Sequence, residues 1–240
     1  MKWMLIAALA MCASAQQSSV VVQVDYMKVA PGKTAEYVKA EEAVKTAVHQ
    51  DRVKKGVINS WSLYAVRFPS GASREFDFAT VTVYPDMSKL EQPFDAGHRN
   101  SMRDTGVGPL RSLVRSDILS PFVSAGAVES AWPWVTVNYI KAKPGMMADW
   151  RADESEAWKA VAEAQIKGGS LKAWVAGSVV WPAGSSREYD FVSVNARETF
   201  VQKQTPGAQA MGSRAANRSA RHGEAIRREM WRLVSRTTPR

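Results

Sequence analysis

The chain carries one pattern twice, and no other feature of the sequence limits its fold as strongly. The segment PSGASREFDF at 69–78 returns 113 residues later as PAGSSREYDF at 182–191. The same offset aligns residues 22–82 with residues 135–195 without a gap, and 22 of the 61 aligned pairs are identical. We therefore expect two units of similar fold, one after the other.

Hydrophobic periodicity predicts the same elements in each unit. Val22, Val24 and Tyr26 alternate with polar residues, as in a strand, and residues 34–55 place apolar side chains on one helical face. A five-residue loop with glycine then separates two strands, which is typical of a hairpin. The expected elements of the first unit are a strand at 22–27, a helix at 34–55, strands at 58–68 and 74–84, a partly helical segment after 87 and a last strand at 115–123, whose counterpart is 228–237. This β-α-β-β-α-β order is that of a ferredoxin-like unit.

We expect an α+β fold in which two tandem ferredoxin-like units, 20–124 and 133–240, are joined by a linker at 125–132. The helices of such a unit cover only one face of its sheet, and the apolar residues of the other face also need a cover. A second unit in the same chain is the obvious cover. The two sheets are therefore expected to pack against each other within one molecule.

The start of each unit carries a resemblance to a known family. Each unit opens with a strand that ends in KVAPGK or KAKPGM, followed by an acidic helix and a strand with a tryptophan. In this order the chain resembles the dimeric α/β-barrel superfamily, here as an intramolecular pair. The resemblance implies a barrel-like cavity between sheet and helices, and a monomer with an internal pseudo-dimer or a homodimer. Members of that superfamily include cofactor-free monooxygenases, lactone isomerases, polyketide cyclases and haem-handling enzymes, so the resemblance implies a fold and not one reaction.

The N-terminus has the plan of a secretory signal. Lys2 precedes an apolar run at 3–11, and Ala13-Ser14-Ala15 follows. This predicts a signal peptide at 1–15, cleaved after Ala15, and a periplasmic or secreted protein. The run is shorter than the ~20 residues that cross a bilayer, so we expect no transmembrane segment. The alternative, a lipoprotein anchored at Cys12, is less well supported because Met11 stands where that motif has a small residue.

Composition narrows the chemistry of the mature chain. Cys12 is the only cysteine and lies in the signal, which excludes disulfides and thiolate catalysis. No spacing of His, Asp and Glu is typical of a metal site. The formal charge is +9, and residues 214–240 hold eight arginines against two glutamates. Arginine clusters bind anionic partners, but this stretch lacks the interleaved aromatic residues of a base-stacking platform, so we do not expect nucleic acid.

The repeated hairpin supplies the first candidates for acid–base chemistry. On a strand that starts at Arg74, Glu75 and Asp77 would share one face, and Phe76 and Phe78 would share the other face with Arg74. In a closed cavity, one of two neighbouring carboxylates tends to keep its proton. The alternative is structural, because charged pairs at hairpin ends commonly serve strand pairing and register.

Glu41 and its counterpart Glu154 are the second pair of candidates. Their helical spacing places each beside apolar side chains, where a carboxylate costs free energy unless it is paired or protonated. Each is therefore either a general base with a raised pKa or the partner of the hairpin arginine, Arg74 or Arg187.

Histidines and aromatic residues complete the candidates. His49 has an alanine as its counterpart and so belongs to the first half alone. Haem-handling members of the superfamily use a helix histidine, which makes His98 and His222 candidate haem ligands, but no motif accompanies them and we expect no bound cofactor. The repeated aromatics either line a pocket for a flat apolar ligand or pack in the core. The predicted catalytic residues are Glu41, His49 and Asp77, and the predicted ligand-binding residues are Tyr26, Trp61, Tyr64, Arg74, Tyr139, Glu154, Trp174 and Asp190.

Three functions remain open on this basis. The favoured one is an exported protein of unassigned activity that binds a small, largely apolar molecule in a barrel cavity. The alternatives are a cofactor-free enzyme of the monooxygenase or isomerase type, and an envelope interaction protein with a basic C-terminal face. A raised carboxylate pKa in a closed site favours the enzyme, and solvent-exposed carboxylates exclude it. If one half alone functions, His49 and Tyr64 favour the first half.

Overall fold

The computed structural model describes residues 20–71, 74–127, 131–184, 187–200 and 206–237. The first half contains β1 (Val21–Val29), α1 (Thr34–Val44), a π-helical turn (Lys45–His49), α2 (Gln50–Lys54), β2 (Ser60–Phe68), β3 (Phe78–Tyr84), α3 (Met87–Leu90), α4 (Ala96–Asp104), a 3-10 turn (Gly108–Leu110) and β4 (Arg111–Gly126). The second half contains β5 (Trp134–Ala142), α5 (Met147–Asp153), a π-helical turn (Glu154–Trp158), α6 (Lys159–Lys167), β6 (Ala173–Trp181), β7 (Phe191–Arg197), α7 (Pro206–Ser219) and β8 (Gly223–Arg236).

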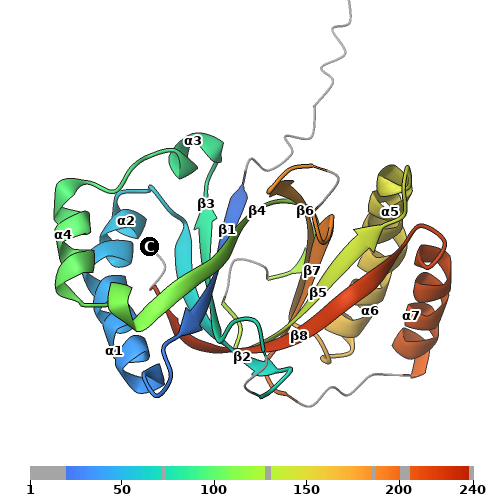
Figure 1. The fold of residues 1–240 in the computed structure, drawn as a ribbon. Coiled ribbons are helices and arrows are strands. Elements are labelled where there is room, and N and C mark those ends of the chain that lie inside the picture. Colours follow the sequence, from blue (N-terminus) through green and yellow to red (C-terminus); the bar gives the residue numbers. More distant parts are fainter. Residues whose placement is uncertain (1–19, 72–73, 128–130, 185–186, 201–205, 238–240) are drawn as a thin grey trace, which may run out of the picture.

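The eight strands close into one antiparallel barrel. The first half contributes four neighbouring strands in the order β4-β1-β3-β2, and the second half contributes β8-β5-β7-β6. Two junctions join the halves, because β2 pairs with β8 and β4 pairs with β6. The helices lie outside the barrel on two opposite sides, with α1, α2 and α4 over the first half and α5, α6 and α7 over the second (Figure 1). Because the barrel is closed, every described strand has a hydrogen-bonded neighbour on both sides. The inner face of each half-sheet is covered by the half-sheet of the other half.

The predicted helix at 34–55 is present from Thr34 to Lys54, but it is not α-helical throughout. The π-helical turn Lys45–His49 lies between its two α-helical parts, α1 and α2. The second half has such a turn as well, at Glu154–Trp158. The offset of 113 would place that turn at residues 41–45, so the two halves widen their helices at different points. Single π-turns are frequent at functional sites, which draws attention to Glu154 and His49.

The prediction that a strand begins at Arg74 is wrong. β3 begins at Phe78, and Phe76 and Phe78 lie on opposite sides of the barrel wall, Phe76 among the interior side chains and Phe78 beneath the helices. The reason lies at Asp77, whose backbone N–H donates to Met27 O at 2.8 Å while its carbonyl accepts from Val66 N at 2.9 Å. The Asp77 carboxylate also accepts from Val29 N at 2.9 Å, so its side chain lies along the sheet instead of pointing to one face, and the alternation from Phe76 to Phe78 is broken.

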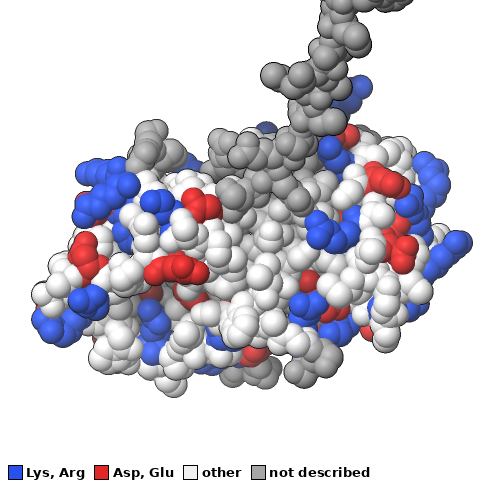
Figure 2. Space-filling view, turned by 90° about the horizontal axis from the view of Figure 1, so that it is seen from above, with Lys and Arg blue, Asp and Glu red and all other residues white. Residues whose placement is uncertain are grey.

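The basic residues of the C-terminal segment do not form one face. In β8, Arg227 stacks on Tyr139 in the barrel interior, whereas Arg228 donates to Asn138 and Arg236 donates to Ala131 O. Strand alternation separates neighbouring arginines in this way. On the face that Figure 2 shows, side chains of both charges lie intermingled. Within the described residues, no helix combines the length and the apolar character that a membrane crossing needs; the predicted signal at 1–15 lies outside them.

Candidate functional site

The structure separates the sequence-predicted residues into three places. Tyr26, Tyr64 and Tyr139 face the barrel interior. Glu41, His49 and Trp61 lie between the sheet and the helices of the first half, and Glu154 and Trp174 lie in the corresponding layer of the second half. Arg74, Asp77 and Asp190 lie where the hairpin meets the barrel wall. These places have different chemistry.

The hairpin carboxylates fasten the hairpin to a neighbouring strand. Asp77 accepts from Val29 N at 2.9 Å and from Arg74 Nε at 2.7 Å. Burial opposes the charge, but these two donors outweigh it, and the pKa of Asp77 lies below its ordinary value. Asp190 makes the same two bonds, to Ala142 N at 2.9 Å and to Arg187 Nε at 2.6 Å. Both carboxylates thus accept the same pair of hydrogen bonds in their own half. This shared structural role explains why the segment occurs twice in the sequence.

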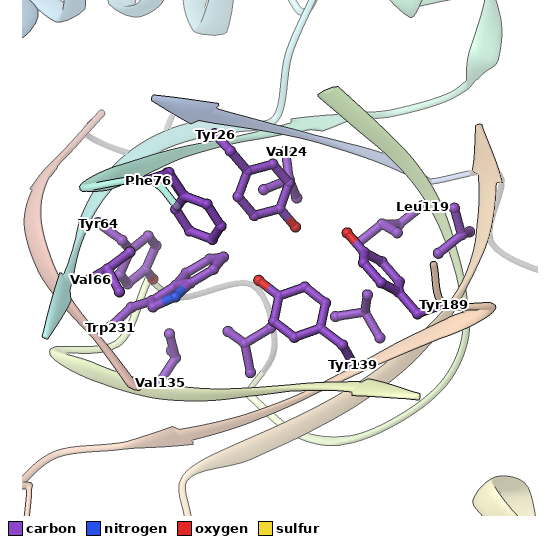
Figure 3. Close-up of a cluster of buried hydrophobic side chains, with 14 of the residues drawn as sticks. Val24, Tyr26, Tyr64, Val66, Phe76, Leu119, Val135, Tyr139, Tyr189 and Trp231 are labelled. Atoms are coloured by element: carbon purple, nitrogen blue, oxygen red, sulfur yellow. The ribbon is translucent and has the colours of Figure 1, made fainter. Parts of the chain in front are cut away.

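The barrel interior is filled with aromatic side chains whose polar atoms have partners. Tyr26, Tyr139 and Tyr189 turn their hydroxyls toward the middle, beside Phe76 and Trp231 (Figure 3). Their rings pack edge to face, with centroids 4.6 Å apart for Tyr26 and Phe76 and 4.8 Å apart for Tyr139 and Tyr189. The aromatics expected to line a pocket therefore pack as core.

Two buried carboxylates bind these hydroxyls. Tyr189 donates to Asp117, and Tyr139 donates to Glu229 at 2.9 Å. Trp231 Nε1 donates to the same oxygen of Glu229, also at 2.9 Å. Burial raises the pKa of both carboxyls above the ordinary value. Each carboxyl accepts a hydrogen bond from a buried side chain, so a structural role in the barrel interior accounts for both.

A four-residue charge cluster joins the two halves at this interior. Arg115 Nη1 lies 3.2 Å from Glu75 and 3.3 Å from Glu188, and Arg227 Nη1 lies 2.8 Å from Glu75 and 3.5 Å from Glu188. The guanidinium groups also stack on tyrosine rings, 4.3 Å from the Tyr26 centroid for Arg115 and 4.2 Å from the Tyr139 centroid for Arg227. Each arginine thus contacts a carboxylate of both halves.

Sequence reasoning missed these interior residues, although a signal was present. Arg115 and Asp117 have Arg227 and Glu229 as counterparts at an offset of 112 instead of 113. The strand register shows the equivalence, since Tyr26 pairs with Arg115 and Tyr139 pairs with Arg227. A one-residue gap after the ungapped alignment would have exposed the repeated Arg-x-Asp/Glu pattern.

Glu41 lies in the helix–sheet layer of the first half opposite an arginine. It is 3% exposed, and Arg111 Nε lies 3.4 Å from its Oε1. Burial raises the pKa of Glu41 above its ordinary value, and the Arg111 guanidinium opposes the rise. The hydroxyl of Tyr37 lies beside Glu41, and the pKa of this hydroxyl is raised first by burial and then by the Glu41 carboxylate.

His49 lies in the same layer and stacks on Trp61, with ring centroids 4.7 Å apart and planes 9° from parallel. Burial, followed by the charges of Arg52 and His98, lowers the pKa of His49 to about 3. Its Nδ1 has no hydrogen-bond partner among the described residues. At neutral pH the ring is uncharged, so one ring nitrogen can donate a hydrogen bond and the other can accept one.

Glu154 occupies the place of Glu41 in the second half, but its surroundings differ at two positions. Trp150 stands where the first half has Tyr37, and Gly223 stands where it has Arg111, since Gly223 pairs with Ala142 as Arg111 pairs with Val29. A Cβ at Gly223 would lie 2.8 Å from the Trp150 ring, so the indole occupies the space that a side chain would need. The second half has therefore exchanged the cation for an indole.

This exchange leaves Glu154 without a cation beside it among the described residues. The residue is 3% exposed, and its Oε2 has no hydrogen-bond partner in the described part of the chain. Burial raises the pKa of Glu154 to about 8; the Trp150 indole opposes the rise and the neighbouring Asp153 adds to it. A buried polar atom without a partner is rare and calls for an explanation. Glu154 thus combines burial, an oxygen without a partner in the described part of the chain and a raised pKa.

Asp153, which the sequence did not single out, holds the end of α7 beside this site. It is fully buried, forms an ion pair with Arg218 and shares a hydrogen bond of 2.6 Å with His222 Nδ1. The offset of 113 pairs Asp153 with Ala40, so nothing in the repeat marked it. Alanine cannot bind Arg218 or His222 in this way, so these two contacts are specific to the second half.

The residues present do not fit haem. His98 has both ring nitrogens engaged, Nε2 with Asp51 at 2.8 Å and Nδ1 with Asp95 at 3.1 Å. His222 shares one ring nitrogen with Asp153 and lies in the turn between α7 and β8, not on a helix as expected. The groove described along α7 has a volume of about 270 Å³. Pockets for drug-sized ligands measure roughly 300–1,000 Å³, and a porphyrin needs more than the groove offers. Within the described residues, no group of three or more His, Cys, Asp or Glu side chains is placed to hold a metal ion.

Comparisons with known proteins bear on the fold. No protein-family model and no curated relative matches the chain. Among solved structures, a protein from Lactobacillus acidophilus NCFM described as a provisional monooxygenase has a TM-score of 0.59 at 11% identity and covers 92% of this chain and 96% of its own. An anthrone oxidase-like protein has a TM-score of 0.58 at 10% identity, covering 92% and 93%. A heme-binding protein from Thermus thermophilus has a TM-score of 0.55 at 12% identity, covering 90% and 92%. These likenesses show the fold: the chain is an α+β protein with the architecture of a dimeric α/β barrel.

Proposed function

We propose that the chain is an enzyme that transfers protons without a bound cofactor, of the oxygenase or isomerase type, and that Glu154 carries the proton. Its body consists of two tandem ferredoxin-like units that act as an internal pseudo-dimer. The signal at 1–15 sends the chain to the periplasm or out of the cell. The substrate is a small, largely apolar molecule.

The observation that carries this proposal is the buried carboxylate of Glu154, whose Oε2 has no hydrogen-bond partner among the described residues; burial raises its pKa. A buried carboxylate without a counter-charge costs free energy, and the Tyr37–Arg111 arrangement of the first half shows that this fold can supply one. The second half omits it. Perturbed carboxyls of this kind cluster at functional sites because a base that works near neutral pH needs a pKa close to that pH.

We therefore place the proposed active site in the second half. The sequence had favoured the first half because His49 and Tyr64 occur only there. The pKa of His49 is far below neutral, so the imidazole does not become charged under ordinary conditions. Tyr64 lies in the barrel interior, on the other side of the barrel wall from Glu41. Among the described residues of the first half, none combines a carboxylate that lacks a cation with a pKa near neutral.

The chemistry follows from a carboxylate that titrates near pH 8. Glu154 removes a proton from an activated C–H of the substrate, leaving a carbanion. Return of the proton to another atom completes an isomerisation. With dioxygen as co-reactant, a CH₂ group becomes C=O and one water is released, so that R₂CH₂ and O₂ give R₂C=O and H₂O. An anthrone is a suitable probe, because its CH₂ group is activated in this way and a structural neighbour is anthrone oxidase-like.

The test is oxygen uptake by the purified protein with anthrone, together with exchange of its CH₂ protons for deuterium in D₂O without oxygen. We expect both rates to rise with pH up to about 8, as Glu154 loses its proton. Glu154→Gln is expected to lower both by a factor on the order of 10²–10⁴, the usual worth of a positioned base. Glu163→Gln, an exposed change on α6, is the matched control.

Two results would overturn the proposal. One is an unchanged exchange rate in Glu154→Gln. The other is a wild-type protein that accelerates neither uptake nor exchange over buffer for anthrone and for a set of enolisable ketones. The second result would leave the carrier function, in which the chain only binds a small molecule; the groove beside α7 is the observation that favours it.

A further inference from the structure

A groove runs between the π-helical turn and α6 on one side and α7 on the other. Its volume is about 270 Å³, and it is lined by Ala157, Ala160, Val161, Met211, Arg214, Ala215 and Arg218. The two helices lie side by side outside the barrel (Figure 1). The floor of the groove is apolar and built of small side chains, and methionine adds an adaptable surface. Two arginines provide its charged groups.

The two arginines have different tasks. Arg218 is bound by Asp153 and by Glu156, the latter at 2.8 Å, and so holds α7 against the preceding helix. Arg214 lies one helical turn earlier on α7, is exposed, and faces the same groove. Residues four apart on a helix share one side, so both guanidinium groups border the groove together. An apolar floor with a guanidinium at its border suits a molecule that is apolar with one negative group.

The groove adjoins the helix that carries Glu154. Ala157 belongs to the same π-helical turn as Glu154, and Val161 follows in α6. Asp153, which precedes Glu154, binds Arg218 at the end of the groove. A molecule in the groove therefore lies along the helix that presents the proposed proton carrier.

We infer that the α6–α7 groove binds a small, largely apolar anion, with Arg214 paired to its negative group and the alanine floor in contact with its apolar part. The inference rests on the proposed function insofar as the bound molecule is the substrate of Glu154. It narrows the substrate to compounds with one carboxylate, sulfonate or phenolate group on an apolar body. Binding itself requires only the groove.

The test compares two fluorescent probes on the full chain: anilinonaphthalene sulfonate, and its neutral parent phenylnaphthylamine, which lacks only the sulfonate. We expect the sulfonate to bind more tightly. Arg214→Gln should weaken its binding roughly ten-fold, the size of a charge-assisted hydrogen bond, and leave the neutral probe unchanged. Arg214→Lys should restore most of the affinity, and Ala160→Leu, which fills the floor, should weaken both probes. Arg221→Gln, which removes an exposed arginine beyond the end of α7, is the matched control.

The outcomes separate this inference from the proposed function. Equal affinity of Arg214→Gln and Arg221→Gln for the sulfonate would overturn the inference that the groove binds the anion. This conclusion would not depend on whether the protein catalyses a reaction. Unchanged binding in Ala160→Leu would do the same, because the probe would then lie elsewhere. Glu154→Gln should keep sulfonate binding while losing proton exchange; loss of exchange without loss of binding supports both conclusions, and retained exchange overturns the enzyme alone.

Discussion

Single neighbours decide what the buried titratable residues do. Glu41 and Glu154 occupy equivalent positions and are equally buried, yet of the two only Glu41 has an arginine beside it in the described part of the chain. With Gly223 in place of Arg111, Trp150 in place of Tyr37 and Asp153 in place of Ala40, burial raises the pKa of Glu154 to about 8. His49 shows the opposite direction, because burial disfavours a charged imidazole as strongly as it disfavours a carboxylate.

The raised pKa of Glu154 makes the stability of the protein depend on pH. In the unfolded chain the carboxyl ionises near 4.5, whereas in the folded protein it keeps its proton up to about 8. Its contribution to the free energy of unfolding is fully present below pH 4.5 and is lost as the pH rises to 8, by about 4 kcal/mol. We expect Glu154→Gln to remove this loss, so that the variant exceeds wild type in stability above pH 8.

Urea unfolding at pH 4.5 and above pH 8 measures this effect, since the midpoint shifts with the free energy of unfolding. Glu163→Gln serves as control because Glu163 is exposed on the same helix. If Glu154→Gln and wild type differ by the same amount at both pH values, the carboxyl of Glu154 has an ordinary pKa.

At the scale of elements, the repeated hairpin acts as an anchor. Lys28 Nζ donates to Arg74 O, and Lys141 Nζ donates to Arg187 O, both at 2.7 Å. With the carboxylate bonds described above, each hairpin is tied to the first strand of its half by the same set of contacts. The chain preserves the segment because these contacts place the residues between loop and strand, including those that enter the barrel.

Removing one of these carboxylates should detach the hairpin. Asp190→Ala leaves Ala142 N and the Arg187 guanidinium without their acceptor in a buried place, and we expect a loss of about 3 kcal/mol in the free energy of unfolding. Asp190→Asn keeps an acceptor oxygen and should lose less. Chemical denaturation measures the stability of both variants, with Glu198→Gln, an exposed change, as control. If Asp190→Ala is as stable as this control, Asp190 does not anchor the hairpin.

At the scale of the whole molecule, closure of the barrel depends on contacts between the halves. Strand pairing β2–β8 and β4–β6 supplies the backbone bonds. The side-chain cluster of Arg115, Arg227, Glu75 and Glu188 lies where the halves meet, with each arginine between two carboxylates. These ion pairs link side chains of the two halves in addition to the strand pairing.

A double-mutant cycle on Arg115 and Glu188 tests this cross-half contact. We expect a coupling energy of about 1 kcal/mol from Arg115→Gln, Glu188→Gln and the double variant, because Arg115 is largely buried while Glu188 is half-exposed. The exposed pair Arg103 and Asp104 should show almost none. Equal coupling in the two pairs would mean that the cluster does not hold the halves together.

The sequence by itself determined the repeat and the order of elements, because periodicity and the offset of 113 report which faces must be buried. The barrel was expected only from the family that this order resembles. It also pointed to Glu41 and Glu154, since a carboxylate between apolar helical positions is visible in the spacing. Only the tertiary structure decided their difference: Arg111 reaches Glu41 from a distant strand, whereas strand register places Gly223 at the equivalent position of the second half. For the same reason, no local pattern could show that Asp77 is held as an acceptor, that Arg115 and Arg227 meet in the barrel, or that α6 and α7 enclose a groove. Burial and pKa depend on neighbours that the fold brings together from far along the chain.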